Sequence, residues 1–302
     1  MATDPGPRRL RLCFVIQRFG LEVAGGSELH CRWLAARLAR RHDVRIVTTC
    51  ALDYLEWRNH YPPGPADVAG LPVMRHPVRR PRDAHRFALL SDLVFHEEHS
   101  LEDERQWVVE NGPDSPELVR SLRALPGVDL FIFYSYRYYQ TFFGLPTVKD
   151  RAVLVPTAEE DPAIELPVFG DVFRNARGIV YLTPEERSLV QGVSGNAAVP
   201  SVVVGSGINV PSGHGDVDAS ARFDLRGRYV LYVGRIDRNK GVDRLFTYWQ
   251  RLHEEWPDLP PLVLVGRPAL DIPEHRKIRH LGFVSEEEKF ALLSGCDLLV
   301  LP

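Results

Sequence analysis

Along most of the chain, short apolar stretches of strand length alternate with segments whose apolar residues have helical spacing. Residues 10–16 form the first such stretch, and residues 28–41 then repeat apolar positions along one helical face. This alternation is typical of βαβ units with parallel strands. In the first part of the chain we expect strands at 10–16, 44–49, 73–77, 129–134, 152–156, 178–182 and 201–204. The expected helices there are 28–41, a long polar helix at 83–110, and a shorter one within 113–126.

A change of composition divides the chain in two. Residues 205–216 (GSGINVPSGHGD) are rich in Gly and Ser and include a proline, which is typical of a linker. The alternation then restarts, with strands expected at 229–233, 262–265, 281–284 and 298–301, and helices at 242–256 and 286–293. The predicted fold class is α/β, with two Rossmann-like parallel-sheet domains that face each other across a cleft. The predicted domains are 1–208 and 209–302.

The second domain is predicted to be incomplete. The sequence ends at Pro302, directly after its last expected strand. In a doubly wound sheet, ligands bind near the loops that follow the strands. A chain that ends there lacks the loop and helix that would cover its last strand, so we expect a truncated domain.

Composition limits the classes of function. The chain has 302 residues, a length that suits two domains, and a formal net charge of -3. No overall basic field therefore favours nucleic acid as a partner. No apolar stretch reaches the roughly 18 residues that span a bilayer, and no signal core follows Met1. Free thiols are expected at all four cysteines, since no C-x-x-C spacing occurs. We expect a soluble cytoplasmic protein.

The first candidate site lies between the first strand and the first helix. Gly25 and Gly26 would let a ligand approach the backbone, and the helix would present free N–H groups to a phosphate or an acceptor hydroxyl. A plain strand-to-helix turn, capped by Ser27 with Glu28 in the first turn, explains the same residues. The sequence leaves both interpretations open.

The second candidate site is the segment GRIDRNKG at residues 234–241, again between a strand and a helix. Arg235, as a planar fork, and Lys240, as a point charge, could converge on a diphosphate. A departing nucleoside diphosphate needs such neutralisation, because negative charge develops on it in the transition state. The alternative is a solvated basic loop. Arginine is common in this chain, whereas lysine is scarce, so Lys240 is the more informative residue.

Four further segments carry candidate residues. Arg267 and Val284 follow later expected strands and could frame a base or ribose, or belong to ordinary loops and a helix cap. Glu159 and Glu160 follow the strand at 152–156 and are the candidate catalytic carboxylates, although acidic residues also favour a helix N-terminus. His96 and His99 could share a helical face around a metal, but the polar surroundings favour a solvated helix. No metal or cofactor is expected.

A basic cluster lies between the third strand and the long helix. It consists of Arg75, Arg79, Arg80 and Arg82, and two prolines flank or interrupt it. The cluster could contact anionic lipid at the membrane periphery or a charged acceptor, but an exposed arginine-rich loop is the interpretation that we favour.

Taken together, these segments resemble the retaining glycosyltransferases of family 4, which have the GT-B fold. Residues 229–246 (YVLYVGRIDRNKGVDRLF) look like the family's G-R-x-x-x-x-K-G phosphate loop, and residues 25–28 are similar to its G-G-x-E segment. Residues 202–209 resemble the crossover between its domains. The last 22 residues, 281–302, resemble the segment before its donor-binding end.

The resemblance implies transfer of a sugar from a nucleotide-diphosphate sugar to a glycan, a lipid-linked acceptor or a small molecule, with retention and without a metal. It assigns Arg235 and Lys240 to the donor diphosphate. It places Gly25 and Gly26 beside the sugar and phosphate, and Arg267 and Val284 near the base. The first domain would bind the acceptor and the second the donor.

Two departures from the family pattern limit this assignment. The E-x7-E region that should follow the last strand is absent, and the loop after residues 152–156 contains no histidine. A catalytically incomplete fragment or non-catalytic partner therefore remains the alternative. Another GT-B-like enzyme, such as a sugar phosphorylase or a nucleotide-sugar epimerase, is a third candidate.

Overall fold

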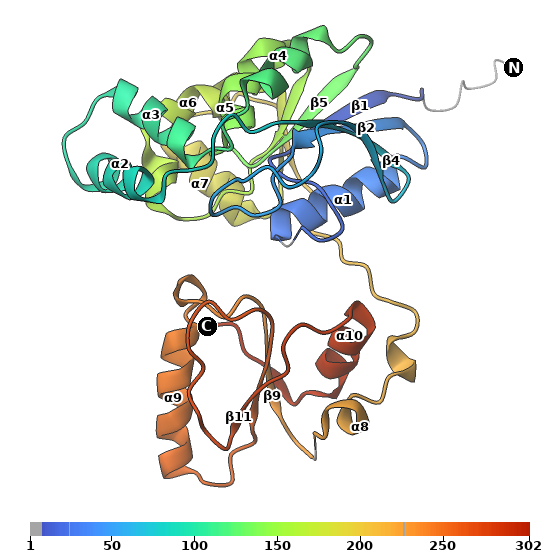
Figure 1. The fold of residues 1–302 in the computed structure, drawn as a ribbon, viewed down its shortest axis with the longest axis vertical. Coiled ribbons are helices and arrows are strands. Elements are labelled where there is room, and N and C mark those ends of the chain that lie inside the picture. Colours follow the sequence, from blue (N-terminus) through green and yellow to red (C-terminus); the bar gives the residue numbers. More distant parts are fainter. Residues whose placement is uncertain (1–7, 24, 226) are drawn as a thin grey trace, which may run out of the picture. The chain divides into compact units, whose positions relative to one another are not determined.

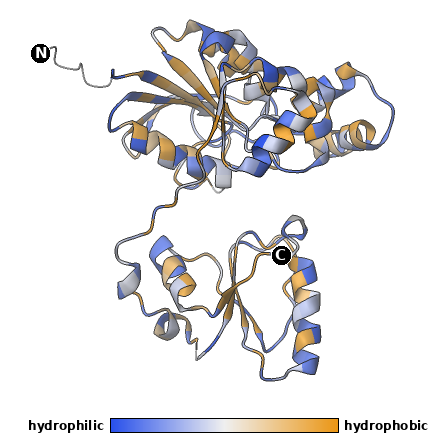
Figure 2. Ribbon diagram, turned by 180° about the vertical axis from the view of Figure 1, so that it is seen from behind, coloured by the Kyte–Doolittle hydropathy of each residue, from blue (hydrophilic) through white to orange (hydrophobic). Residues whose placement is uncertain are grey.

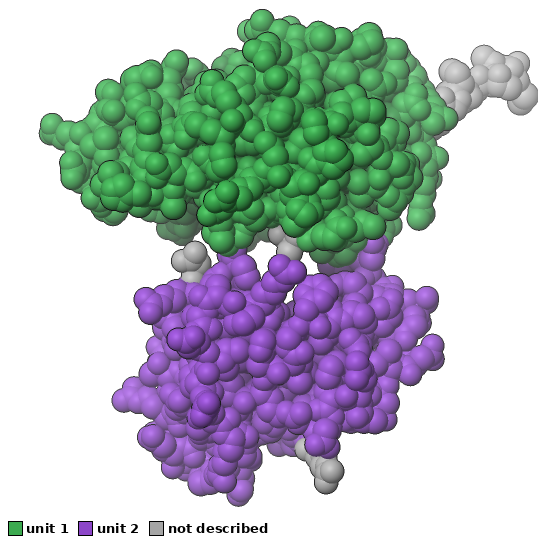
Figure 3. All heavy atoms as spheres, viewed as in Figure 1, with its two compact units in different colours: residues 1–207 green, residues 208–302 purple. Residues whose placement is uncertain are grey.

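The chain forms two compact units. The computed structural model describes residues 8–23, 25–225 and 227–302, and it divides into Met1–Gly207 and Ile208–Pro302 (Figures 1 and 3). The segment that leads from β8 of unit 1 into unit 2 has no regular structure over residues 204–211. Each unit is built around its own sheet, so each is described by itself.

Unit 1 contains an eight-stranded sheet in the order β3-β4-β2-β1-β5-β6-β7-β8. All neighbouring strands are parallel except β3 and β4, which form an antiparallel pair. The strands are β1 (Arg11–Val15), β2 (Asp43–Thr49), β3 (Gly64–Val68), β4 (Leu71–His76), β5 (Leu130–Tyr134), β6 (Ala152–Val155), β7 (Gly178–Tyr181) and β8 (Ser201–Val203).

Helices cover both faces of this sheet because its strands are apolar on both sides. In β1, Leu12 and Phe14 enter one buried cluster with Cys31 and Ala35 of α1, whereas Cys13 and Val15 enter another. Figure 2 shows the apolar strands and, around them, helices that carry both apolar and polar residues. The helices of unit 1 are α1 (Gly26–Leu38), α2 (Ala84–His96), α3 (Leu101–Asn111), α4 (Pro116–Ala124), α5 (Tyr139–Gly144), α6 (Gly170–Arg174) and α7 (Pro184–Ser194), with the 3-10 turns η1 (Leu145–Arg151), η2 (Pro162–Glu165) and η3 (Pro167–Phe169).

Unit 2 contains a four-stranded, fully parallel sheet in the order β11-β10-β9-β12. Its strands are β9 (Val230–Val233), β10 (Leu262–Val265), β11 (Ile278–His280) and β12 (Leu298–Leu299). The helices are α8 (Ala219–Phe223), α9 (Val242–Glu255) and α10 (Glu286–Gly295), with η4 (His214–Asp216) and η5 (Arg238–Lys240). One buried cluster lies under α9 and the other under α8 and α10.

The predicted α/β class with parallel sheets is confirmed, but several elements differ from the prediction, and helices α5, α6, α7 and α8 were not predicted. The expected long helix at 83–110 is two helices, because Ser100 and Asp103 form a capping box that starts α3. The β3–β4 hairpin was not predicted, since β3 (GPADV) contains no apolar run, is mostly exposed and lies at the sheet edge. The strand expected at 281–284 lies instead at Ile278–His280.

No helix among the described residues combines the length and apolar character that crossing a membrane requires. The cysteines at positions 13, 31, 50 and 296 are all free, as predicted.

Candidate functional site

A polar cavity lies where the strand order of unit 1 reverses. Strands β2, β3 and β4 continue on one side of β1, and β5 begins the other side. At such a switch point the loops that leave the two strands diverge and open a crevice at their carboxyl ends. The loops after β5 and β6 and the start of α1 enclose a cavity of about 270 Å³ there.

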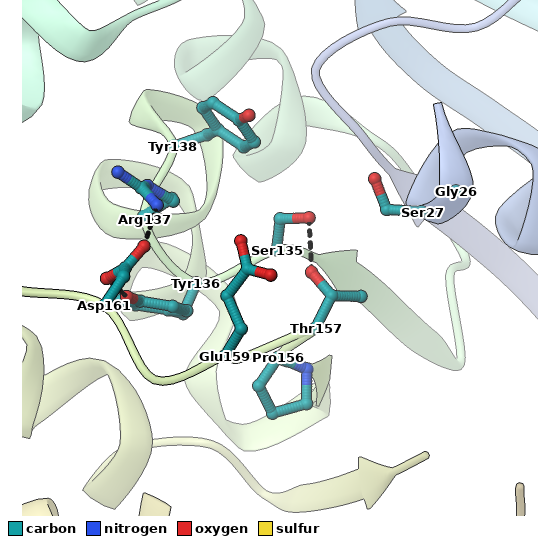
Figure 4. A pocket seen from close by; sticks show the side chains of 10 residues that line it. All are labelled: Gly26, Ser27, Ser135, Tyr136, Arg137, Tyr138, Pro156, Thr157, Glu159 and Asp161. Carbon is teal, nitrogen blue, oxygen red and sulfur yellow. Dashed lines mark hydrogen bonds and ion pairs between the residues drawn. The ribbon is translucent and has the colours of Figure 1, made fainter. Parts of the chain in front are cut away.

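Short polar side chains and aromatic hydroxyls line this cavity (Figure 4). The lining residues are Gly26, Ser27, Ser135, Tyr136, Arg137, Tyr138, Pro156, Thr157, Glu159 and Asp161. Burial raises the pKa of Tyr138, so its phenol stays neutral at physiological pH. A lining of this kind, rich in hydroxyl groups, suits a ligand that carries several hydroxyls of its own.

Two lining residues hold an unusual backbone conformation. Ser135 has φ 63° and Thr157 has φ 48°, and their hydroxyl oxygens lie 2.7 Å apart in a shared hydrogen bond. Positive φ is unfavourable for a β-branched residue such as Thr157 and commonly marks a functional site. Glu186 of α7 fixes the same loop, because its carboxylate accepts the N–H of Ala158 at 2.8 Å.

The charged residues that line the cavity differ in their ion pairing. Arg137 forms an ion pair with Asp161, which also caps η2, so these two charges are satisfied by each other. Glu159 is exposed, lines the cavity and forms no ion pair with a described residue. In Figure 4 its carboxylate is turned into the cavity, and Arg137 and Asp161 are drawn on the opposite side from Ser27. Glu160 is exposed but does not line the cavity, so the structure separates the two predicted catalytic carboxylates.

Gly25 and Gly26 have different roles. A Cβ on Gly25 would overlap Glu28 Oε2, whereas a Cβ on Gly26 would meet nothing within 4 Å. Gly26 lines the cavity and Gly25 makes room for the Glu28 carboxylate. Ser27 does not cap the helix, as the plain-turn interpretation supposed, because the N-cap is Gly25, without a side-chain cap, and Ser27 Oγ donates to Glu28 instead (2.8 Å). The first N–H groups of α1 are therefore left without a side-chain cap.

Glu28, which follows the cavity residue Ser27 in the sequence, is the centre of a buried polar network. Gln17 Nε2 donates to its Oε1 at 3.0 Å and Arg18 Nε at 2.9 Å. Both Arg18 and Glu28 are almost fully buried, so each needs the other as a partner. Sequence reasoning missed Gln17 and Arg18, although the signal was present: two polar residues directly follow an apolar strand.

The basic loop of unit 2 is positioned by Asp237. Its carboxylate forms an ion pair with Arg235 Nε (2.6 Å) and accepts the Lys240 N–H (2.9 Å), which starts η5. Gly241 closes the loop in the left-handed conformation (φ 69°) and is the N-cap of α9. Arg235 and Lys240 are exposed and follow the carboxyl end of β9, where the order of this sheet also reverses. Their predicted role with a diphosphate stays a prediction.

The loops after β9 and β10 contact each other closely. A Cβ on Gly266 (φ 141°) would overlap the carbonyl oxygen of Gly234. Arg267 is exposed, and its carbonyl accepts the N–H of Ile236 at 3.0 Å. Val284 is 8% exposed and packs in the core under α10. A contact between Val284 and a base would therefore have to use its main chain, and the predicted place of Val284 near the base stays a prediction.

The basic cluster is engaged inside unit 1. Arg79 binds Asp114 at 2.7 Å, Arg80 binds Glu110 through Nη1 at 3.1 Å, and Arg82 donates to the carbonyl oxygen of Asn111. Arg75 is buried and stacks on the Tyr61 ring at 3.8 Å. These contacts explain the cluster by internal pairing, so the surface for anionic lipid that we considered at this loop is not required.

The two histidines considered for a metal do not converge. His96 contacts Asp92 (3.3 Å), whereas His99 contacts Glu104 (3.2 Å). Within the described part of the chain, no group of three or more His, Cys, Asp or Glu side chains could hold a metal ion.

Comparisons with known proteins give a fold. No protein-family model matches the chain, and no curated protein matches it. Solved structures do match. The α,α-trehalose-phosphate synthase (UDP-forming) of Burkholderia vietnamiensis aligns with a TM-score of 0.61 at 14% identity, covering 96% of this chain and 78% of that one.

Two other solved structures align over a similar length. Anabaena HepE in complex with UDP gives a TM-score of 0.58 at 13% identity, covering 96% of this chain and 73% of that one. The UDP-N-acetylglucosamine 2-epimerase of Rickettsia bellii gives 0.53 at 12% identity, with 97% and 74% covered. At such identities the likeness establishes the fold alone: this chain has the α/β architecture of GT-B structures, with a largely parallel sheet in each unit.

Proposed function

We propose that this protein is a glycosyltransferase that moves a sugar from a nucleotide-diphosphate sugar to a hydroxyl group of an acceptor. The observation that carries the proposal is the loop of residues 234–241, which presents Arg235 and Lys240 at the switch point of a GT-B-like sheet. The similar structures include a UDP-forming synthase and a UDP complex, which supports a nucleotide sugar as the donor.

In this proposal, unit 2 binds the donor diphosphate. Arg235 and Lys240 would offset the charge that develops on the departing nucleoside diphosphate. Asp237 would act as a positioning residue, because its carboxylate holds the Arg235 guanidinium and caps the turn that contains Lys240. Arg267, in the adjacent exposed loop, is the side chain that we assign to the base or ribose.

Unit 1 would bind the acceptor and the transferring sugar in its polar cavity. Ser135, Thr157 and Tyr138 offer hydroxyl groups to a polyol, and Gly26 leaves open space at the start of α1. Glu159 is the carboxylate that could accept the proton of an acceptor hydroxyl. We propose transfer with retention and without a metal. The acceptor would be a glycan, a lipid-linked sugar or a small molecule, met in the cytoplasm or at the membrane periphery.

The donor assignment is tested by calorimetry with a panel of nucleoside diphosphates. We expect Arg235→Ala and Lys240→Ala each to weaken binding by about tenfold, since each removes a charge-assisted hydrogen bond. Arg251→Ala, which removes an exposed arginine of α9, is the matched control and should bind normally. Unchanged affinity in both loop variants would contradict the assignment.

The catalytic assignment is tested by turnover. Glu159→Gln should lower kcat by about a hundredfold or more, the scale of general acid–base catalysis, and Glu160→Gln should lower it far less. NMR of the product anomer decides retention. An epimerised donor formed without any acceptor would favour an epimerase instead. If the protein binds the nucleotide but transfers no sugar to any acceptor that is supplied, the result would favour a non-catalytic partner.

A further inference from the structure

A second cavity lies at the amino-terminal ends of the unit 2 strands, away from the basic loop. It has a volume of about 290 Å³. Tyr229, Pro261 and Lys277 line it, and they directly precede β9, β10 and β11. The basic loop follows β9 at its carboxyl end. The two features therefore occupy opposite ends of the same strands and could not share one small ligand.

The lining of this cavity is strongly basic. Its cations are Arg228, Arg276, Lys277 and Arg279, and Asp224 is the one carboxylate among its described lining residues. Arg228 is paired with Asp297 outside the lining, at 2.8 Å. No described carboxylate forms an ion pair with Arg276, Lys277 or Arg279. An excess of positive charge therefore faces the cavity.

Two of these cations are held in place by the backbone. Arg279 donates to the carbonyl oxygens of Asp224 (2.6 Å) and Phe223 (2.7 Å), which end α8. Lys277 Nζ donates to the carbonyl oxygen of Leu259 at 2.9 Å. Carbonyl groups fix the direction of the side chains but do not neutralise them, so the charges are oriented and remain available to an anion.

A buried histidine lies close to these cations. The pKa of His253 in α9 is lowered, first by burial and then by Lys277, His275 and Arg276. Two cations that line the cavity, Lys277 and Arg276, therefore lie close enough to His253 to disfavour its protonation.

We propose that this basic cavity at the amino-terminal ends of β9, β10 and β11 binds a phosphate-bearing ligand. Arginine guanidinium groups match phosphate oxygens in pairs, and lysine adds a point charge, which favours phosphate over a singly charged carboxylate. The same chemistry serves a free phosphate, a phosphorylated sugar or a phospholipid headgroup. The site is separate from the proposed donor loop and does not depend on it.

The test is a titration of the isotope-labelled 302-residue chain with inorganic phosphate, followed through the amide NMR signals of Tyr229 and Lys277. These signals report the cavity and not the donor loop, so failure here is distinguishable from failure of the donor assignment. We expect saturable shifts that weaken about tenfold in Arg276→Gln/Lys277→Gln and that diminish as ionic strength rises. The absence of saturable shifts at these amides, or equal affinity in the double variant, would overturn the proposal.

Two controls keep the result interpretable. Arg251→Gln carries the same charge change as Arg276→Gln, outside the cavity, and should bind phosphate as the parent does. Arg276→Gln alone removes an exposed side chain and serves if the double variant unfolds at a lower temperature.

The source of the phosphate is decided by flotation with phosphatidylcholine vesicles that contain phosphatidylglycerol. Vesicle binding that is lost in the double variant assigns the site to a lipid headgroup. Phosphate binding without vesicle binding assigns it to a solute. Either result supports the site itself.

Discussion

A close contact can decide which residue type fits at a position, and Gly25 is the clearest case in this protein. Its φ of 165° is extended backbone that any residue adopts, so strain does not select glycine here. The reason is space: a Cβ would lie 2.8 Å from Glu28 Cδ and 3.2 Å from Arg18 Nη2. Glu28 cannot move aside easily, because Gln17, Arg18 and Ser27 all donate to it.

Gly25→Ala should therefore destabilise unit 1 by about 1–3 kcal/mol, the usual cost of overpacking a buried site. Gly26→Ala is the matched control and should cause no loss, since open space surrounds its Cβ position. Urea unfolding measures both. Equal stability of the two variants would show that the Glu28 network can rearrange around the new Cβ without a loss of unfolding free energy.

We expect His253 to make the stability of unit 2 depend on pH. The residue is 6% exposed, and neither ring nitrogen has a hydrogen-bond partner of good geometry, although the Pro260 carbonyl lies nearby. Burial, then Lys277, His275 and Arg276, lower its pKa below 6.5. Protonation of His253 is therefore less favourable in the folded state than in the unfolded state. The stability that unit 2 has with a neutral His253 is fully present above pH 6.5. It is lost as the pH falls from there through the lowered pKa of His253 in the folded state.

We expect His253→Phe to reduce the pH dependence of unit 2 stability between pH 6.5 and pH 5. The difference in slope can reach about 1.4 kcal/mol per pH unit, the linkage of one proton. Tryptophan fluorescence during urea unfolding can follow this, since Trp249 packs beside His253. Parallel profiles for the parent and the variant would assign the pH response to other groups.

Among the elements, α2 and α3 show how a local cap overrides a helical pattern. The sequence pattern predicts one helix from residue 83 to residue 110, but Ser100 accepts the Asp103 N–H and the Asp103 carboxylate accepts the Ser100 N–H. This capping box starts a new helix, which lets Trp107 of α3 stack near Phe87 and Phe95 of α2. The break is what allows the two helices to pack on each other.

Ser100→Ala should cost about 1 kcal/mol of unfolding free energy, because it removes the N-cap acceptor. Ser100→Asp should keep most of the stability, since aspartate also caps well. Thermal unfolding distinguishes the two variants. If alanine and aspartate had the same effect, the cap would not be what separates α2 from α3.

At the scale of the whole molecule, the division into two units is the main property. Each unit has its own sheet with a buried cluster on both faces. The segment between them, residues 204–211, has no regular structure, and its residues 206–210 are exposed. Few internal contacts hold such a segment in place, so it should be accessible to proteases.

Brief digestion with elastase should cut within residues 204–213 before it cuts elsewhere, because the segment is exposed and contains small residues. Trypsin is the control, since residues 204–213 contain no lysine or arginine. Mass spectrometry of the fragments locates the cut. First cleavage inside β9 or α9 would show that unit 2 opens more easily than the linker.

Much of this architecture could be predicted from the sequence. Apolar runs such as residues 129–134 and 262–265 encode buried parallel strands, because both of their faces must be covered. The Gly-rich turns before α1 and α9 were also predictable. The mostly exposed β3 contains no apolar run and gave no such signal, and it pairs with β4 at the edge of the sheet.

The candidate site divides in the same way. By itself, the sequence determined which residues follow strands, and therefore that Glu159, Arg235 and Lys240 lie at the carboxyl ends of strands, the general location of ligand sites in doubly wound sheets. Only the tertiary structure decided that Ser135 and Thr157 meet across two loops, that Arg137 is paired with Asp161, and that Val284 faces the core. The physical reason is that strand periodicity is local, whereas side chains distant in sequence find their partners only when the sheet brings its loops together.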